Sequence, residues 1–284
     1  MDEKEVNINE LHDFKDNPYS VKDDEDMQML TESIKEFGII EPLLVRKRDE
    51  GGFEVISGHR RKYAGVKAGL EKVPVFIRNM DRDSAVIALV DSNLHRKNIL
   101  PSEKAFAYKM KLEAMKHQGK KIDDTSRQVV GKSETSDLIG EQTGESGRQV
   151  QRYVRLTELI KPILDMVDDN KMAMSPAVEL SYLTKEEQED LLETMESEEK
   201  TPSLSQAQRM KELSKQGLLD MDTIFEIMIE PKANEKEIVK FEVNSIQKYF
   251  PKNYTIRQMI ETIEKLLQDY QQQWKRKNRE RDSR

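Results

Sequence analysis

The sequence FEVISGHRRKYA, residues 53–64, decides the fold of the N-terminal part of the chain. Phe53–Ile56 is rich in aromatic and β-branched residues and is typical of a strand. Gly58 then allows a sharp turn, and Ser57 is expected to cap a helix that opens with His59-Arg60-Arg61. Free backbone amides and the positive end of the helix dipole meet at such a start, so an anion is favoured there.

Arg60 and Arg61 strengthen the prediction of an anion site, because each guanidinium can offer two parallel donors to a phosphate. Gly58 would let the phosphate approach the backbone, which gives a triphosphate cradle without the lysine of a P-loop. The alternative is a solvated basic helix start that binds nothing. The pattern alone leaves both interpretations open.

Strand and helix patterns alternate on either side of this segment and predict an α+β domain over residues 1–98. The expected elements are a helix over Asp26–Phe37, strands over Ile40–Arg46, Phe53–Ile56 and Val73–Ile77, a helix that ends at Gly69, and a helix from Asp83 to about Leu94. From Pro101 onward only helical patterns follow. We therefore expect an all-α domain over residues 99–215 and a helical segment over residues 216–284, with polar junctions at 116–136, 196–205 and 230–237.

Composition limits the classes of function. The chain has 284 residues, a formal net charge of -7, no cysteine and four histidines. The negative charge argues against coating nucleic acid by bulk electrostatics, so any DNA contact must be local. Disulfides and thiolate chemistry are excluded, and the histidines show no metal-ligand spacing. With no signal-like start and no apolar run of membrane length, we expect a soluble, cytoplasmic protein without membrane contact.

A second candidate cluster is Asp91–Arg96, which follows an apolar helix. The amide oxygen of Asn93 can ligate a hard cation, and Arg96 could close on a phosphate. A helix C-terminus with a surface arginine is the alternative.

The segment 137–156 predicts a helix-turn-helix. Gly144 permits the turn, Ser146 caps the second helix, and four apolar residues are expected to pack inward: Leu138, Ile139, Val150 and Val154. The residues expected to face DNA are Ser146, Gly147, Arg148, Gln149, Gln151 and Arg152, which include side chains that can contact phosphates or the edges of guanine and adenine. A plain helical hairpin is the alternative.

The C-terminal segment opens at Thr255, with Gln258 placed for a capping box, and continues as a heptad seam. The seam consists of Ile256, Ile260, Ile263, Leu267, Tyr270 and Trp274. It predicts pairing of two copies, although an amphipathic helix folded back on its own chain would look the same. The basic tract after Trp274 is expected to be a frayed tail that adds a non-specific DNA contact.

Taken in order, these segments resemble ParB-type partition proteins from Val6 to about Leu213. Four boxes carry the resemblance, in the order and approximate spacing of that family's nucleotide pocket: Asn17–Tyr19, Gly38–Arg46, Gly58–Arg61 and Ser92–Arg96. The resemblance implies a ParB/sulfiredoxin-like N-terminal fold. It also implies a pocket for cytidine triphosphate (CTP) and Mg²⁺, a homodimer that closes on double-stranded DNA at a centromere-like site, and a ParA-type ATPase partner.

By position, the resemblance places Gly58, Arg60 and Arg61 at the phosphates, with His59 in the same box, Asn93 at the metal and Arg96 as a brace. Departures from the family matter at four places: His59 and Ser92 stand where glutamates are usual, Glu41 replaces a glutamine, and Met174-Ser175-Pro176 replaces a Gly-His-x-Arg segment. Loss of a carboxylate at Ser92 favours nucleotide binding over hydrolysis, at most a weak CTPase, unless Asp91 compensates. The departures favour a mobile-element or accessory version, associated with nucleoid or plasmid.

Two other classes of protein fit parts of the pattern. The small N-terminal fold also resembles sulfiredoxins, whose chemistry needs a cysteine that this chain lacks, and a free-serine kinase, which would need a carboxylate base. A transcription regulator or adaptor without nucleotide switching is the second alternative. The expected function is that of a DNA-binding partition protein gated by a nucleotide.

Overall fold

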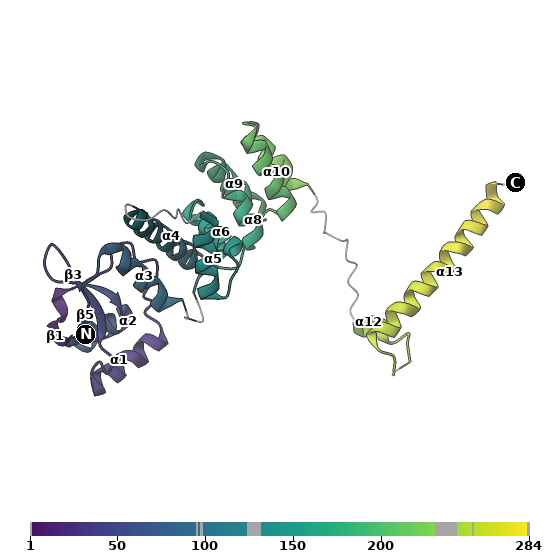
Figure 1. Ribbon diagram of the computed structural model, residues 1–284. Coiled ribbons are helices and arrows are strands. Elements are labelled where there is room, and N and C mark those ends of the chain that lie inside the picture. Colours follow the sequence, from purple (N-terminus) through teal and green to yellow (C-terminus); the bar gives the residue numbers. More distant parts are fainter. Residues whose placement is uncertain are drawn as a thin grey trace. The chain divides into compact units, whose positions relative to one another are not determined.

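The computed structural model describes residues 2–94, 96, 99–123, 132–230, 243–251 and 253–282. The chain forms two compact units, residues 1–230 and residues 231–284 (Figure 1). Each unit is considered by itself below.

The first unit begins with a five-stranded mixed sheet in the order β1-β5-β3-β4-β2. Its strands are β1 (Asp2–Asn7), β2 (Leu11–Asp13), β3 (Leu43–Lys47), β4 (Phe53–Ser57) and β5 (Lys72–Ile77). The β1/β5 and β3/β4 pairs are antiparallel, whereas the β3/β5 and β2/β4 pairs are parallel. This architecture confirms the expected α+β class of the N-terminal part.

Helices cover both faces of the sheet. They are a short 3-10 helix (Ile8–Glu10), α1 (Glu25–Phe37), α2 (His59–Ala68) and α3 (Arg82–Asn93). Successive side chains of a strand point to opposite faces. Val55 accordingly joins the apolar core that includes residues of α1 and α2, while Ile56 joins the core that includes α3 and the first helix beyond it. Helix boundaries agree with the sequence-based prediction within one or two residues.

Two local expectations were wrong. Ser57 does not cap α2; it is the last residue of β4 and pairs with Leu44, and Gly58 takes the N-cap position with φ 104° and ψ 20°. No side-chain hydrogen bond caps α2, so its first amides remain open to a ligand. The strand expected from Ile40 begins at Leu43, because Ile40 is 82% exposed and Pro42 has no amide to donate.

The rest of the first unit is helical. The helices are α4 (Pro101–Asp123), α5 (Lys132–Thr143), α6 (Gly147–Leu156), α7 (Lys161–Asp168), α8 (Met174–Leu180), α9 (Lys185–Glu198), α10 (Leu204–Lys215) and α11 (Met221–Ile229). Within the described residues, no strand follows Pro101, as predicted. The junction at residues 116–136 lies partly, and the junction at 230–237 mostly, outside the described residues.

The apolar cores that the helices share indicate where the domain boundaries lie. Ile224 and Ile227 of α11 are buried in the same apolar cluster as α7 to α10, so the helical region continues past the expected end at residue 215 and reaches Glu230. Leu89 of α3 and Ala107 of α4 share another cluster. Helix α4 therefore packs on the α+β part, and the division at residues 98/99 remains a prediction.

The second unit contains α12 (Val243–Gln247) and α13 (Ile256–Asp282). The predicted capping box at the start of α13 is present: the Thr255 amide donates to Gln258 Oε1 at 2.9 Å, and the Gln258 amide donates to Thr255 Oγ1 at 3.3 Å. The side chains from residue 272 onward, including Trp274 and the basic tract, lie outside the described residues. No helix in the described part of the chain combines the length and apolar character needed to cross a membrane.

Candidate functional sites

The first candidate site is a cavity of about 170 Å³ where α2 starts and α3 ends. It gathers all six residues predicted for the nucleotide site: Gly58, His59, Arg60, Arg61, Asn93 and Arg96. The remaining lining comes from the segment that contains Asn17 and Tyr19, together with Ser20 and Val21. Sequence reasoning missed Ser20 and Val21, whose one signal was their position directly after the Asn17–Tyr19 box.

Carboxylates already stand beside both arginines of this cavity. Arg60 Nη2 lies 3.6 Å from Asp24 Oδ1. Arg61 Nη1 lies 3.1 Å from Glu41 Oε2 and also donates to the carbonyl oxygens of Glu41 and Pro42. An anionic ligand would therefore compete with these carboxylates for the guanidinium groups.

His59 contributes a neutral ring. Burial lowers the pKa of its imidazole below the ordinary value, so the uncharged form dominates near neutral pH. Its Nε2 atom is buried and has no hydrogen-bond partner among the described residues. Buried polar atoms normally have a partner, so this nitrogen is available to a ligand group or water.

The predicted metal ligand Asn93 is engaged within the protein. Arg96 Nη1 donates to Asn93 Oδ1 at 3.3 Å, and Asn93 Nδ2 donates to the Leu89 carbonyl at 2.9 Å. The Asp91 carboxylate, the one that could compensate for Ser92, accepts a hydrogen bond from Lys111 of α4. The described residues contain no group of three or more His, Asp or Glu side chains placed to hold a metal. The donor set fits an anion and does not by itself fit Mg²⁺.

The second candidate site is the α5–α6 pair. Gly144 has φ 73° at the turn, and Ser146 Oγ accepts from the Gln149 amide at 3.2 Å, as predicted. A Cβ on Gly140 would lie 2.5 Å from the Glu145 carbonyl oxygen, so the helix and the turn approach closely. Ile139 and Val150 are fully buried, and Val154 packs against the same core.

Two residues of this pair lie differently from expectation. Leu138 is 45% exposed, because the helix turns its side chain away from the core that holds Ile139. Gly147 is buried against Asp137, where a Cβ would clash, and so it permits close packing. The exposed surface of α6 starts at Arg148.

Helix α4 holds parts of both sites. Glu103 Oε1 accepts from the amide and the hydroxyl of Ser20 at 3.0 and 2.8 Å, beside the first cavity. Lys104 Nζ and Tyr108 OH bond to the carboxylate of Glu145, in the α5–α6 turn, at 2.8 and 3.1 Å. Lys111, with a side chain 1% exposed, bonds to Asp91 at the end of α3 and to Gln142 of α5.

The predicted DNA-facing residues differ in exposure and in their hydrogen bonds within the protein. Arg148 and Gln151 are exposed, while Gln149 and Arg152 are half-buried. Arg152 donates to Gln149 Oε1 at 3.1 Å and to Ser175 Oγ at 2.7 Å, and Gln151 Nε2 donates to Ser136 Oγ at 3.3 Å. Ser175 at the start of α8 thus fixes the orientation of Arg152.

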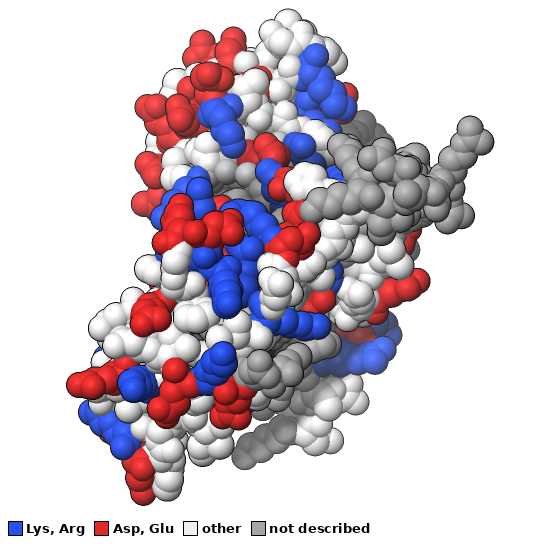
Figure 2. All heavy atoms as spheres, turned by 60° about the vertical axis from the view of Figure 1, so that its left-hand side comes forward, with Lys and Arg blue, Asp and Glu red and all other residues white. Residues whose placement is uncertain are grey.

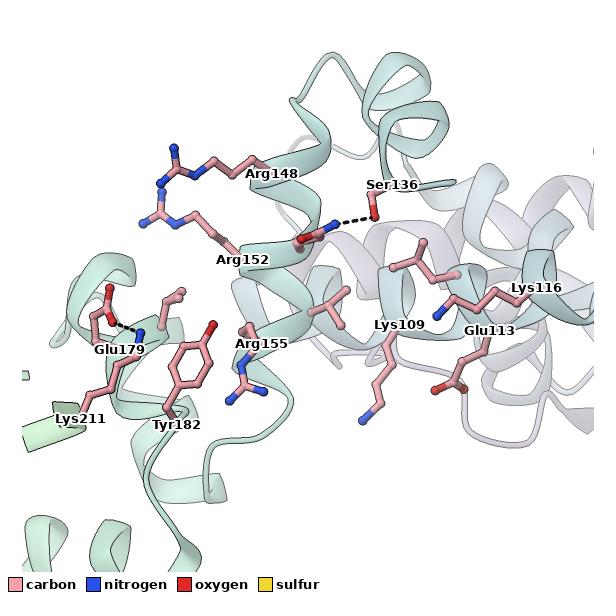
Figure 3. Close-up of a pocket in the computed structure, with 14 residues that line it drawn as sticks. Lys109, Glu113, Lys116, Ser136, Arg148, Arg152, Arg155, Glu179, Tyr182 and Lys211 are labelled. Atoms are coloured by element: carbon pink, nitrogen blue, oxygen red, sulfur yellow. Dashed lines mark hydrogen bonds and ion pairs between the residues drawn. The ribbon is translucent and has the colours of Figure 1, made fainter. Parts of the chain in front are cut away.

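A groove of about 540 Å³ runs beside this face of α6, between α4 on one side and α8 and α10 on the other (Figure 3). We call it the α6 groove. Its charged lining comprises six cations, Lys109, Lys116, Arg148, Arg152, Arg155 and Lys211, and two carboxylates, Glu113 and Glu179. Figure 2 shows a cluster of Lys and Arg side chains in the middle of one face of the molecule. Sequence reasoning missed four of these cations: three lie on α4 and α10, far from α6 in sequence, and Arg155 lies one turn beyond the predicted reading residues.

The α+β part thus carries an arginine-lined cavity and the helical region a cationic groove, so the lining of both candidate sites suits an anionic ligand. Residues 2–94 match the ParB N-terminal domain family. This part of the chain is thus similar to the N-terminal domain of ParB-type partition proteins, and the similarity to proteins of that type extends beyond residue 94.

Curated relatives are similar over a longer stretch of the chain than this domain. The chain is 31% identical over 170 residues to the chromosome-partitioning protein ParB of Myxococcus xanthus, covering 60% of this chain and 51% of that protein. It spans about half the length of the first curated relatives it matches.

Two structures of C-terminally truncated ParB from Caulobacter crescentus are also similar. The one complexed with CTP-gamma-S has 23% identity and a TM-score of 0.32, covering 64% of this chain and 92% of that chain. The one complexed to the centromeric parS site has 19% identity and a TM-score of 0.42, covering 80% of this chain and 100% of that chain.

Proposed function

We propose that this chain is a ParB-like partition protein that binds a centromere-like site on double-stranded DNA through α6 and is gated by a nucleotide in the first cavity. One observation carries the proposal: six residues predicted from two separate boxes, Gly58–Arg61 and Asn93 with Arg96, line a single cavity. Chance placement would not bring both boxes to one helix start.

The chemistry of the cavity favours a triphosphate. Uncapped amides and the positive end of α2 attract the anion, and Arg60 and Arg61 add two cationic forks. CTP is the nucleotide that the family resemblance implies, and Mg²⁺ would arrive bound to its phosphates, with Asn93 as the protein ligand that the same resemblance implies. None of the described residues that line the cavity is a carboxylate, so binding is favoured and hydrolysis is at most weak.

The DNA contact rests on α6. Arg148 and Arg152 can reach guanine edges or phosphates from a capped helix whose opposite side is buried. The chain has a net charge of -7, so DNA binding requires a local cationic surface, and the α6 groove provides one. Association with nucleoid or plasmid DNA follows from this function.

Pairing of two copies through α13 completes the proposal, and a ParA-type ATPase is the partner that the family implies. Ile256, Ile260, Leu267 and Tyr270 of the predicted seam are all more than half exposed in the single chain. Two linked copies would raise the effective concentration of the second α6 at a paired DNA site. Ile263→Asp with Leu267→Asp should convert a dimer into a monomer in light scattering, and a wild-type chain that is monomeric at micromolar concentration contradicts the pairing.

Calorimetry with CTP, in the presence and absence of DNA, tests the switch. Arg60→Ala and Arg61→Ala should each abolish CTP binding, whereas Arg82→Ala, an exposed arginine outside the cavity, should leave it unchanged. CTP should also change the affinity for DNA in the wild-type chain. Unchanged DNA affinity would favour a regulator without a switch, and CTP turnover that depends on free serine would favour a phosphotransferase.

A further inference from the structure

We propose that the α6 groove holds the two phosphate backbones that border the DNA major groove, one through Lys116 of α4 and the other through Lys211 of α10. This inference rests on the proposed DNA contact of α6 and extends it to helices outside the predicted helix-turn-helix.

The first support is the local charge. Six cations and two carboxylates line the α6 groove, although acidic residues outnumber basic ones over the whole chain, 54 to 47. Such a concentration of one sign in a concave surface focuses the potential and attracts a polyanion. The groove is therefore suited to a phosphate backbone.

The second support is the geometry. A helix with its side chains is about 10–12 Å wide, close to the width of about 12 Å of the major groove. When α6 lies in the DNA major groove, the phosphates of the two DNA strands must pass the helices that flank α6 on either side. Figure 3 shows Lys116 on one side of α6 and Lys211 with Tyr182 on the other. The two lysines thus stand where the two backbones would run.

The third support is the availability of these ammonium groups. Lys116 is exposed, and no ion pair or hydrogen bond joins it to another described residue. Lys211 Nζ lies 2.7 Å from Glu179 Oε2 and 3.8 Å from the centre of the Tyr182 ring. These contacts orient Lys211, whose side chain is 19% exposed; a phosphate would compete with Glu179 for its ammonium, which has three hydrogen-bond donors.

Arg155 is excluded from this role. Its guanidinium lies 4.0 Å from the centre of the Tyr182 ring and donates to the hydroxyl and carbonyl oxygens of Ser181. With its donors directed at α8, Arg155 supports Tyr182 and, through it, Lys211.

Fluorescence anisotropy of the full chain on a random-sequence duplex of about 24 base pairs, over a salt series, tests the inference. Lys116→Ala and Lys211→Ala should each weaken binding about three- to tenfold near 0.1 M salt and reduce the slope of log affinity against log salt by about 0.9. The loss should be the same on a duplex selected by the wild-type chain. Lys171→Ala, an exposed lysine paired with Asp169 outside the groove, is the matched control and should bind as wild type.

Lys211→Arg keeps the charge and should restore the slope, which separates a phosphate contact from a role in folding. Slopes of Lys116→Ala and Lys211→Ala equal to that of the control would overturn the inference, while loss of binding in Arg148→Ala would leave the DNA contact of α6 standing. A wild-type chain that binds neither duplex at any salt would instead overturn the proposed function itself.

Discussion

The ion pair between the buried ammonium of Lys111 and the half-exposed carboxylate of Asp91 yields a prediction about stability with an asymmetric outcome. The Lys111 side chain is 1% exposed, whereas the Asp91 side chain is 45% exposed. Asp91→Ala leaves a buried ammonium with Gln142 as its remaining partner among the described residues, and breaking a buried pair in this way costs about 3–5 kcal/mol. Because Gln142 still accepts one hydrogen bond, we expect the lower end, about 3 kcal/mol.

Lys111→Met should cost far less. The thioether fills a similar volume, and the Asp91 carboxylate left behind can be hydrated, so the change should stay within about 1 kcal/mol. For a unit of this size, 1 kcal/mol corresponds to about 2–4 °C in Tm, which predicts a fall of about 6–12 °C for Asp91→Ala. Calorimetric unfolding of the full chain measures both, and Asp169→Ala, which breaks an exposed pair, should shift Tm little. A fall in Lys111→Met as large as in Asp91→Ala refutes the reasoning.

Three further predictions concern the two sites. Glu41→Gln removes the carboxylate that competes for Arg61, and because an exposed pair contributes at most about 1 kcal/mol, CTP affinity in calorimetry should rise by up to about fivefold; an unchanged or lower affinity contradicts the competition. Ser175→Ala removes a 2.7 Å bond to Arg152 and should reduce the preference for a selected duplex about fivefold, with the salt slope unchanged, whereas a changed slope would make Arg152 a phosphate contact. Burial lowers the pKa of His59, so the unfolded state binds the proton more readily, and the free energy of unfolding should be at its full value above pH 6.5 and fall below that pH. His59→Asn should flatten this part of the pH profile, measured by urea unfolding. A profile that the substitution leaves unchanged would mean that another group is titrating.

The parts of the fold that depend on local chemistry were predictable from sequence. Apolar spacing and Gly38 fixed α1, and Gly58 with its flanking residues fixed the turn from β4 to α2. The two boxes of the first cavity were also predictable, because each is a short segment with its own chemistry. The charged positions of the α6 groove were not, since Lys116 and Lys211 meet α6 through packing between distant helices.

The errors also have a physical source. Leu138 and Ile139 are neighbours on α5, and the sequence offers no signal for which of two adjacent aliphatic residues faces the core. Ser57 is a good helix cap by type, yet pairing with β3 holds it in the sheet. At Ser57 a tertiary contact therefore outweighed a local preference, whereas at Leu138 and Ile139 only tertiary packing decides which side chain is buried.

The position of α4 has a practical consequence for anyone who mutates this chain. Glu103 and Lys104 are consecutive, yet the first bonds to Ser20 of the first cavity and the second to Glu145 in the turn before α6. Neighbouring residues on one turn of a helix cannot move independently, because the backbone hydrogen bonds of that turn hold them in a fixed relation. A change at either residue is therefore expected to disturb a support that the two candidate sites have in common, and a phenotype from that turn can be assigned to one site only after the other has been measured.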